Sequence, residues 1–197
     1  MDRHASRIGP NAILQIAAVL KDRHGRAVVE RVFGRAGLAH YLDTPPTAMV
    51  AEREVARLHV ALARELGDAD AETVAREAGQ RTARYILAHR IPGPAKRVLR
   101  LLPPRLAARL LLAAIRRHAW TFAGSATFRA AAGPPVDLSL AGCALCRANI
   151  AGGRLSAFYA ATFEGLFRAL VTRRARITPP GPGWPVAWTA RIDWRAH

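Results

Sequence analysis

Apolar residues recur every three to four positions through the first 117 residues, which is the spacing of one face of an α-helix. This pattern predicts long helices that begin near Ile13, Val28, Ala48 and Ala71, followed by two shorter helices over 95–102 and 105–117. Glycine or proline closes these segments, at Gly25, Thr44-Pro45-Pro46, Gly67, Ile91-Pro92-Gly93-Pro94 and Pro103-Pro104. We therefore expect residues 1–117 to be mainly helical.

The pattern changes after residue 117, where apolar and polar residues alternate as in β-strands. The segments 118–122 and 136–140 alternate in this way, and Gly133-Pro134-Pro135 between them predicts the turn of a hairpin. Residues 155–172 return to the helical period, and 174–178 and 186–194 are two further strand candidates. We expect one α+β domain over 1–197, in which an N-terminal helical layer packs on a small antiparallel sheet and one long helix lies in the C-terminal half.

The charge balance is strongly basic, with 30 Lys and Arg against 14 Asp and Glu, a net charge of +16 and an isoelectric point of about 11.6. Such a charge attracts anionic partners. Nearly all of it is arginine, because Lys21 and Lys96 are the only lysines. A GC-rich genome also produces an excess of Arg and Ala, so the composition alone leaves the partner open.

An arginine-rich stretch with apolar neighbours runs through the two short predicted helices and includes Arg97, Arg100, Arg105 and Arg109. Three explanations remain open: a solvated face, pairing with the carboxylates of a ligand, or contact with an anionic membrane surface. A nucleic-acid partner is not expected, because no zinc-finger or RNA-recognition signature accompanies the charge.

Motifs for nucleotide and redox cofactors are absent. The sequence contains neither a Gly-x-Gly-x-x-Gly turn after a strand nor a Gly-Lys-Ser/Thr phosphate loop, so no intrinsic cofactor is expected. The apolar segment 13–20 lacks a signal-peptide cleavage pattern, and the most apolar stretch, 106–115, contains Arg109 and is too short to span a bilayer. We expect a cytoplasmic location.

Cys143 and Cys146 are the only cysteines. A zinc site usually needs four ligands, and no second pair completes one here, so zinc is not expected. Covalent attachment of a c-type haem is excluded, because Arg147 and not histidine follows Cys146. Structural thiols and a metal or redox role both remain open for this pair.

His118 marks the change from the basic helix to the predicted strand. It is either a hydrogen-bonded histidine at a helix end or an axial ligand for the metal of a macrocycle, with Trp120 and Phe122 as stacking surface. His89, next to Arg90, is the second candidate. The other histidines, including His59, are expected in exposed settings.

Several short segments agree in order with one protein family. These are 7–13, 41–50, 88–92, the stretch 115–125 that contains His118-Ala119-Trp120-Thr121-Phe122, and 158–164. Together they resemble the bacteriochlorophyll 4-vinyl reductase proteins of purple phototrophic bacteria. The resemblance covers most of the chain and implies a vinyl-reductase-type α+β domain that encloses a hydrophobic ligand, with a role at the 8-vinyl step of chlorophyllide synthesis.

With that resemblance, a magnesium tetrapyrrole becomes the expected ligand. We expect it in an aromatic slot whose contacts are Tyr85, His89, Arg90, His118, Trp120, Phe122, Phe158, Tyr159 and Phe163. The missing cofactor motifs favour a carrier or accessory factor over a reductase that takes electrons from a partner, and a membrane- or enzyme-docking scaffold is the third hypothesis. Other enzymes of the pathway, the periphery of the intracytoplasmic membrane and a second copy of the chain are the further partners considered.

Overall fold

The computed structural model describes residues 6–133, 135–141, 154–178 and 186–191. Its helices are α1 (Asn11–His24), α2 (Arg26–Ala36), α3 (His40–Asp43), α4 (Glu52–Leu66), α5 (Asp68–His89), α6 (Gly93–Leu101), α7 (Pro104–Arg117) and α9 (Arg154–Leu170), with the 3-10 turn η1 (Ala119–Thr121). Its strands are β1 (Arg7–Ile8), β2 (Val50–Ala51), β3 (Thr127–Ala131), β4 (Val136–Ala141), β5 (Arg176–Thr178) and β6 (Val186–Arg191). The α+β class expected from the sequence is confirmed.

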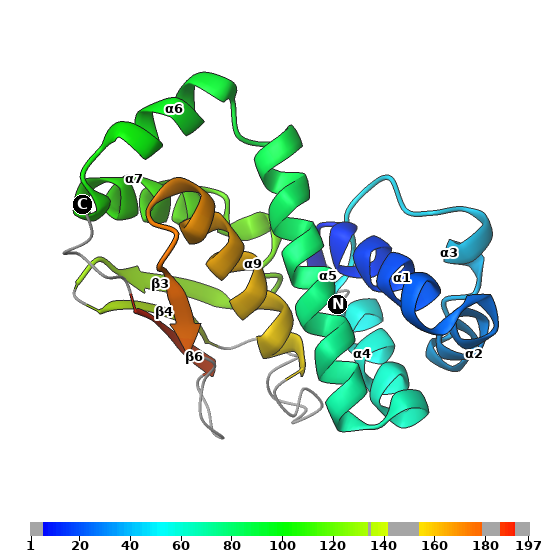
Figure 1. The fold of residues 1–197 in the computed structure, drawn as a ribbon. Helices are drawn as coiled ribbons and strands as arrows, with labels where there is room; N and C mark the ends of the chain where they lie inside the picture. The colour runs from blue at the N-terminus through cyan, green and yellow to red at the C-terminus, as the bar shows by residue number, and fades with distance from the viewer. Residues whose placement is uncertain (1–5, 134, 142–153, 179–185, 192–197) are drawn as a thin grey trace, which may run out of the picture.

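The long helix α5 runs through the middle of the molecule, with α1 and α4 on one side of it and α9 on the other (Figure 1). The helix α2 packs on α1 and α4, farther from α5. The apolar stripes read from the sequence face this interior, and Ile16, Leu20 and Leu58 are fully buried. Gly25 and Gly67 adopt positive φ at the junctions α1–α2 and α4–α5, so each helix ends where the glycine predicts.

The helices α5 and α9 run side by side in the same direction and meet through small residues (Figure 1). A Cβ atom placed on Gly165 would lie 2.6 Å from the Cβ of Ala83, and one placed on Gly79 would overlap the carbonyl oxygen of Phe158. The hydroxyl of Thr162 donates to the carbonyl oxygens of Phe158 and Gly79 at 2.8 and 3.2 Å. The two backbones therefore approach too closely for larger side chains at these positions.

Four of the strands form an antiparallel sheet in the order β3-β4-β6-β5. Along β4 the inward residues Val136, Leu138 and Leu140 are buried, in the alternation that the sequence showed. The helix α9 contacts β5 and β6, and the backbone N–H of Ile177 on β5 donates to the Glu164 carboxylate of α9 at 3.0 Å. The helix α9 thus lies between the sheet and α5 and joins the two halves of the fold.

The predicted hairpin exists, but its first strand was assigned wrongly. β4 pairs with Thr127–Ala131, in register Phe128 with Leu140, and not with residues 118–122. His118 is the C-cap of α7, and Ala119–Thr121 form a 3-10 turn. The helical hydrogen bonding continues into this turn, because the His118 backbone N–H donates to the carbonyls of Ala114 and Ile115. The alternation over 118–122 was therefore coincidental.

The pattern also missed a two-stranded sheet near the N-terminus. β1 pairs with β2, and Ile8 of β1 is buried. Because Val50 and Ala51 form β2, α4 begins at Glu52 and not at the expected Ala48. The backbone N–H of Gly9 donates to the Thr121 carbonyl at 2.7 Å, so β1 also holds η1 in place.

Glu65 links α4 to α2 and gives the fold an acid-sensitive contact. Its carboxylate accepts from Arg31 at 2.6 Å and lies 3.3 Å from Arg35. The Arg31 hydrogen bond holds the pKa of Glu65 below its usual 4.5. A depressed pKa in the folded state stabilises the fold above the unfolded-state pKa, and this contribution disappears as pH falls through the folded-state pKa.

Glu65→Gln is therefore expected to lower the melting temperature at neutral pH and to leave it less dependent on pH in the acid range. Thermal unfolding followed by circular dichroism from neutral pH down to about pH 3 measures this difference. Glu30→Gln is the control, because Glu30 is exposed and pairs only within α2. Equal acid sensitivity of Glu65→Gln and wild type would contradict the assignment.

Candidate functional site

A cluster of aromatic rings lies where α9, the end of η1 and β3 meet. Phe122 is 5.2 Å from Phe128, 5.7 Å from Phe163 and 6.1 Å from Tyr159, measured between ring centroids. Phe158 extends the cluster through Tyr159, at 5.6 Å. The α9 rings are buried, whereas Phe122 and Phe128 are half-buried. The cluster thus has a packed interior and a partly exposed edge.

The hydroxyl of Tyr159 fixes the loop that follows η1. It donates to the backbone carbonyl of Phe122 at 2.7 Å. Burial raises the pKa of this hydroxyl far above its usual 10.0, and the nearby Glu52 carboxylate raises it further. Tyr159 is therefore a neutral donor that holds Phe122 against α9.

Tyr159→Phe is expected to destabilise the fold by about 1–2 kcal/mol, because the Phe122 carbonyl loses its hydrogen-bond donor. In wild type the unfolded chain ionises Tyr159 above pH 10.0 while the folded chain does not, so stability falls as pH rises beyond that value. The variant should lose this part of the alkaline slope. Urea unfolding at neutral and alkaline pH tests both effects, and an unchanged slope would contradict the second.

A buried carboxylate lies beneath the same loop. Glu52, at the start of α4, is 3% exposed, and its Oε2 accepts from the backbone N–H of Ser125 at 3.0 Å. Gly124 adopts φ +59° and would place a Cβ 2.8 Å from that oxygen, so the turn requires glycine. Within the described residues, Oε1 of Glu52 is buried with no hydrogen-bond partner. Glu52 therefore fixes the loop from the side opposite Tyr159.

His59 lies on the same helix as Glu52 and is buried, contrary to the exposed setting expected from the sequence. It is 1% exposed, and its ring meets Phe158 edge-on at 6.4 Å. The sequence does contain a pattern that predicts this burial. His59 follows Val55 by four residues and precedes Leu62 by three, so it lies on the buried stripe of α4.

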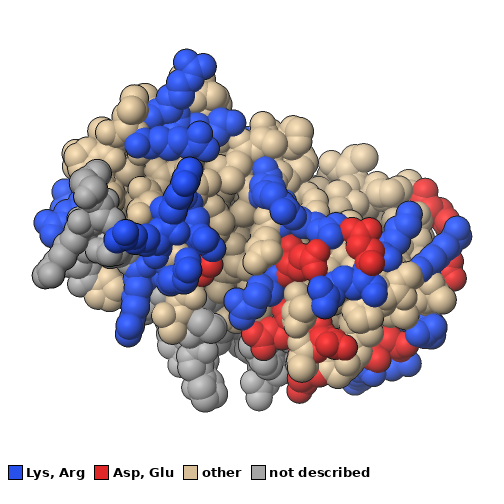
Figure 2. Space-filling view, in the orientation of Figure 1, with Lys and Arg blue, Asp and Glu red and all other residues tan. Residues whose placement is uncertain are grey.

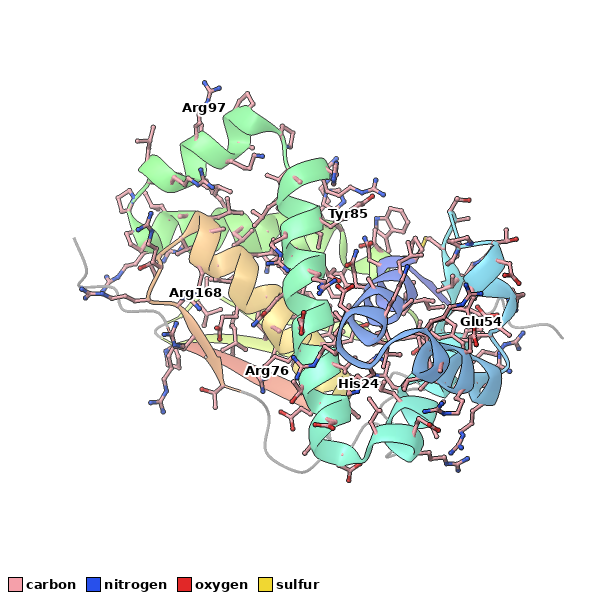
Figure 3. The ribbon with its side chains drawn as sticks, turned by 45° about the vertical axis from the view of Figure 1, so that its right-hand side comes forward. His24, Glu54, Arg76, Tyr85, Arg97 and Arg168 are labelled. Carbon is pink, nitrogen blue, oxygen red and sulfur yellow. The ribbon has the colours of Figure 1, made fainter. Side chains whose placement is uncertain are left out.

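The remaining aromatic and imidazole candidates lie outside this cluster; Tyr85 is half-buried, and His89 is exposed. Trp120 is 64% exposed, and His118, at the end of α7, is also exposed. Tyr85 and His89 contact one another at 4.8 Å on α5, and Figure 3 shows Tyr85 on the side of α5 away from α9. Arg90 is exposed at the C-cap of α5.

The structure brings together four of the predicted contacts, Phe122, Phe158, Tyr159 and Phe163. Sequence reasoning missed Phe128, which completes the cluster from β3. No ring contact among the described residues joins this cluster to Tyr85, His89, His118 or Trp120.

Comparison with known proteins identifies relatives over most of the chain. The chain is 41% identical over 167 residues to a protein of Cereibacter sphaeroides named bacteriochlorophyll synthase 23 kDa chain, covering 85% of this chain and 80% of that protein. It is 46% identical over 166 residues to a Rhodobacter capsulatus protein of the same name, covering 84% and 76%. The chain belongs to the bacteriochlorophyll synthase 23 kDa chain family. A comparison with protein-family models finds no match.

Membership of the 23 kDa chain family confirms the coarser part of the resemblance, that this is a protein of the bacteriochlorophyll pathway. The names of these relatives do not specify 4-vinyl reduction, which therefore stays a prediction.

In this member of the 23 kDa chain family, Cys143 and Cys146 lie outside the described residues, so their role stays a prediction. The described residues contain no group of three His, Cys, Asp or Glu side chains placed to hold a metal. No helix in that part of the chain combines the length and apolarity needed to cross a bilayer.

The arginines predicted to meet carboxylates or a membrane lie on α6 and α7, and Arg97, Arg105 and Arg109 are exposed. Arg100 is exposed too, but its Nε donates to the Ala169 carbonyl of α9 at 3.0 Å. Arg100 therefore contributes to holding α6 on α9.

Proposed function

We propose that the chain binds a magnesium tetrapyrrole intermediate of bacteriochlorophyll biosynthesis and acts as a carrier or accessory factor at the 8-vinyl reduction step. The observation that carries the proposal is the aromatic cluster with a partly exposed edge, in a chain of this family. Binding sites for large flat ligands are mostly apolar and aromatic, with a few polar groups that set orientation. Phe122 and Phe128 supply such a surface, and the exposed Trp120 precedes Phe122 by two residues in the chain.

The loop that carries this edge is held from two sides. Tyr159 bonds to Phe122 from α9, and Glu52 bonds to Ser125 from α4. A surface fixed before binding loses less conformational entropy when the ligand arrives. This supports a binding role for the loop 122–125.

Polar groups for orientation are available at the C-terminal ends of α5 and α7. His118 and His89 are exposed imidazoles, and a neutral imidazole is a suitable axial ligand for magnesium or iron in a macrocycle. The basic side chains of α6 and α7 suit the propionate carboxylates, because guanidinium groups bind carboxylates through two parallel hydrogen bonds.

Titration of the purified protein with magnesium protoporphyrin tests the proposal. The Soret band is expected to shift and tryptophan fluorescence to fall, with saturation at micromolar ligand. Metal-free protoporphyrin is the matched ligand, and His118→Ala and His89→Ala are the matched variants. If one variant bound magnesium protoporphyrin more weakly than wild type but bound metal-free protoporphyrin equally well, the substituted histidine would be the axial ligand. The absence of any spectral change in wild type would contradict the proposal.

A second experiment distinguishes a carrier from a reductase. No nucleotide or redox motif occurs in the sequence, so the pure protein is expected to leave divinyl protochlorophyllide unchanged in the presence of NADPH. Addition of cell extract restores the missing enzyme and serves as the positive control. Monovinyl product formed by the pure protein would assign reduction to this chain.

A further inference from the structure

The helices α6 and α7 carry an exposed aliphatic surface. Val98, Leu101, Leu106 and Leu110 are 53%, 86%, 46% and 52% exposed, and Trp120 is the other large apolar side chain found exposed among the described residues. Isolated exposed apolar side chains are common. Here four lie on two consecutive short helices, and we refer to these four together as the aliphatic patch.

The patch is on the outer side of both helices. On α7 the residues Ala108, Leu111, Leu112 and Ile115 face the interior, so Leu106 and Leu110, four residues apart, share the outer face. On α6 the inner face is fixed by Lys96, which donates to the Leu87 carbonyl at 2.9 Å, and by the Arg100 bond to α9. Val98 and Leu101 are consequently left on the outer side.

Positive charge surrounds this patch without acidic neighbours in the sequence. Residues 78–136 contain eleven Arg and Lys and no Asp or Glu, although they make up less than a third of the chain. Figure 2 shows the contrast, with basic side chains over α6 and mixed charges over α1, α2 and α4. Arg97 points away from the molecule (Figure 3), and neither Arg97 nor Arg109 forms an ion pair within the described residues.

Several arginines on the other helices are neutralised by carboxylates. Arg26, Arg31 and Arg76 each form an ion pair with a carboxylate at 2.6 to 2.9 Å. The aliphatic patch lies in the stretch 82–136, which contains basic residues and no acidic residue to pair with them locally. Aliphatic side chains among cations match the boundary of a bilayer that contains anionic lipids, where acyl chains lie beneath phosphate groups.

We propose that the outer face of α6 and α7 docks the protein on an anionic lipid surface, with Val98, Leu101, Leu106 and Leu110 entering the headgroup boundary and Arg97 and Arg109 binding lipid phosphates. A second copy of the chain would bring like charges together across a two-fold interface. Nucleic acid offers phosphates but no acyl layer for the exposed leucines. The carrier proposal assigns the basic side chains of these same helices to ligand carboxylates, but docking on lipid requires no bound tetrapyrrole.

Sedimentation of the full-length protein with vesicles tests this surface. Phosphatidylcholine vesicles that contain phosphatidylglycerol are expected to bind wild type, whereas pure phosphatidylcholine vesicles bind weakly, and added salt reduces binding. Leu101→Ser with Leu106→Ser should weaken binding about tenfold by removing apolar insertion. Arg97→Gln with Arg109→Gln should weaken it about thirtyfold by removing two cations from an anionic surface.

The matched control is Arg53→Gln with Arg64→Gln, which removes the same charge from exposed positions of α4. This variant is expected to bind as wild type does. Equal losses in both arginine variants would show nonspecific attraction and overturn the proposal. The absence of vesicle binding by wild type would also overturn it. If wild type instead self-associated, and Leu101→Ser with Leu106→Ser abolished that self-association, the face would bind a second copy of the chain. No tetrapyrrole is present, so either result is independent of the carrier test.

Discussion

Gly79→Ala is expected to destabilise the protein by about 3 kcal/mol or to prevent folding, at the upper end of the cost of overpacking a core. The new methyl group would overlap the Phe158 carbonyl oxygen and lie 3.0 Å from the Cβ of Ala161. The obstacle is backbone of α9, so a rotamer change cannot relieve it. Separation of α5 from α9 would also weaken the Thr162 hydrogen bond to Gly79.

Thermal or urea unfolding measures this effect, and a loss of about 3 kcal/mol lowers the melting temperature of a chain of this length by roughly 6–12 °C. Gly34→Ala is the matched control, because Gly34 is within α2 with no atom within 4 Å of an added Cβ. That substitution should stabilise the protein by about 0.5–1 kcal/mol through helix propensity. Equal stability of Gly79→Ala and wild type would contradict the close contact of α5 and α9.

Phe163→Ala is expected to cost about 3–5 kcal/mol, the usual loss for truncating a buried aromatic side chain. Phe163 is 3% exposed and supports both edge residues of the cluster, with its ring 5.7 Å from Phe122 and 5.8 Å from Phe128. Its loss removes core packing and the support for the proposed binding surface together. Urea unfolding gives the stability change.

The matched variant Phe163→Leu keeps apolar volume but removes the ring. It should unfold at higher urea than Phe163→Ala while binding magnesium protoporphyrin more weakly than wild type under conditions where it is folded. If Phe163→Ala were as stable as wild type, the ring would not be part of a packed core. If Phe163→Leu bound the ligand as wild type does, the cluster would not support the binding surface.

Most helices could be predicted because each carries a regular apolar stripe and ends at glycine or proline. The stripe Val55, Leu58, Leu62 of α4 and the stops at Gly25 and Gly67 are examples. The first hairpin strand could not be placed, because β3 presents small alanines beside Phe128 and its alternation is weak. The segment 118–122 alternates more clearly but continues from the end of α7.

The site was predicted in part for similar reasons. The helical period placed Phe158, Tyr159 and Phe163 on the buried side of α9, as the structure has them. Glu52 was missed because an acidic residue in the first turn of a helix usually faces solvent. Its burial follows from the turn at Gly124, a contact between residues more than seventy positions apart that no local pattern contains.

The central claim is that the partly exposed aromatic edge near Phe122 binds a magnesium tetrapyrrole. The most direct test compares equilibrium titrations of wild type, Trp120→Ala and Leu101→Ala with magnesium protoporphyrin. Both substitutions remove an exposed side chain, so the fold should remain intact in each. Saturable micromolar binding by wild type and Leu101→Ala, with about tenfold weaker binding by Trp120→Ala, is the predicted result. Identical affinities in all three proteins, or no saturable binding by wild type, would contradict it.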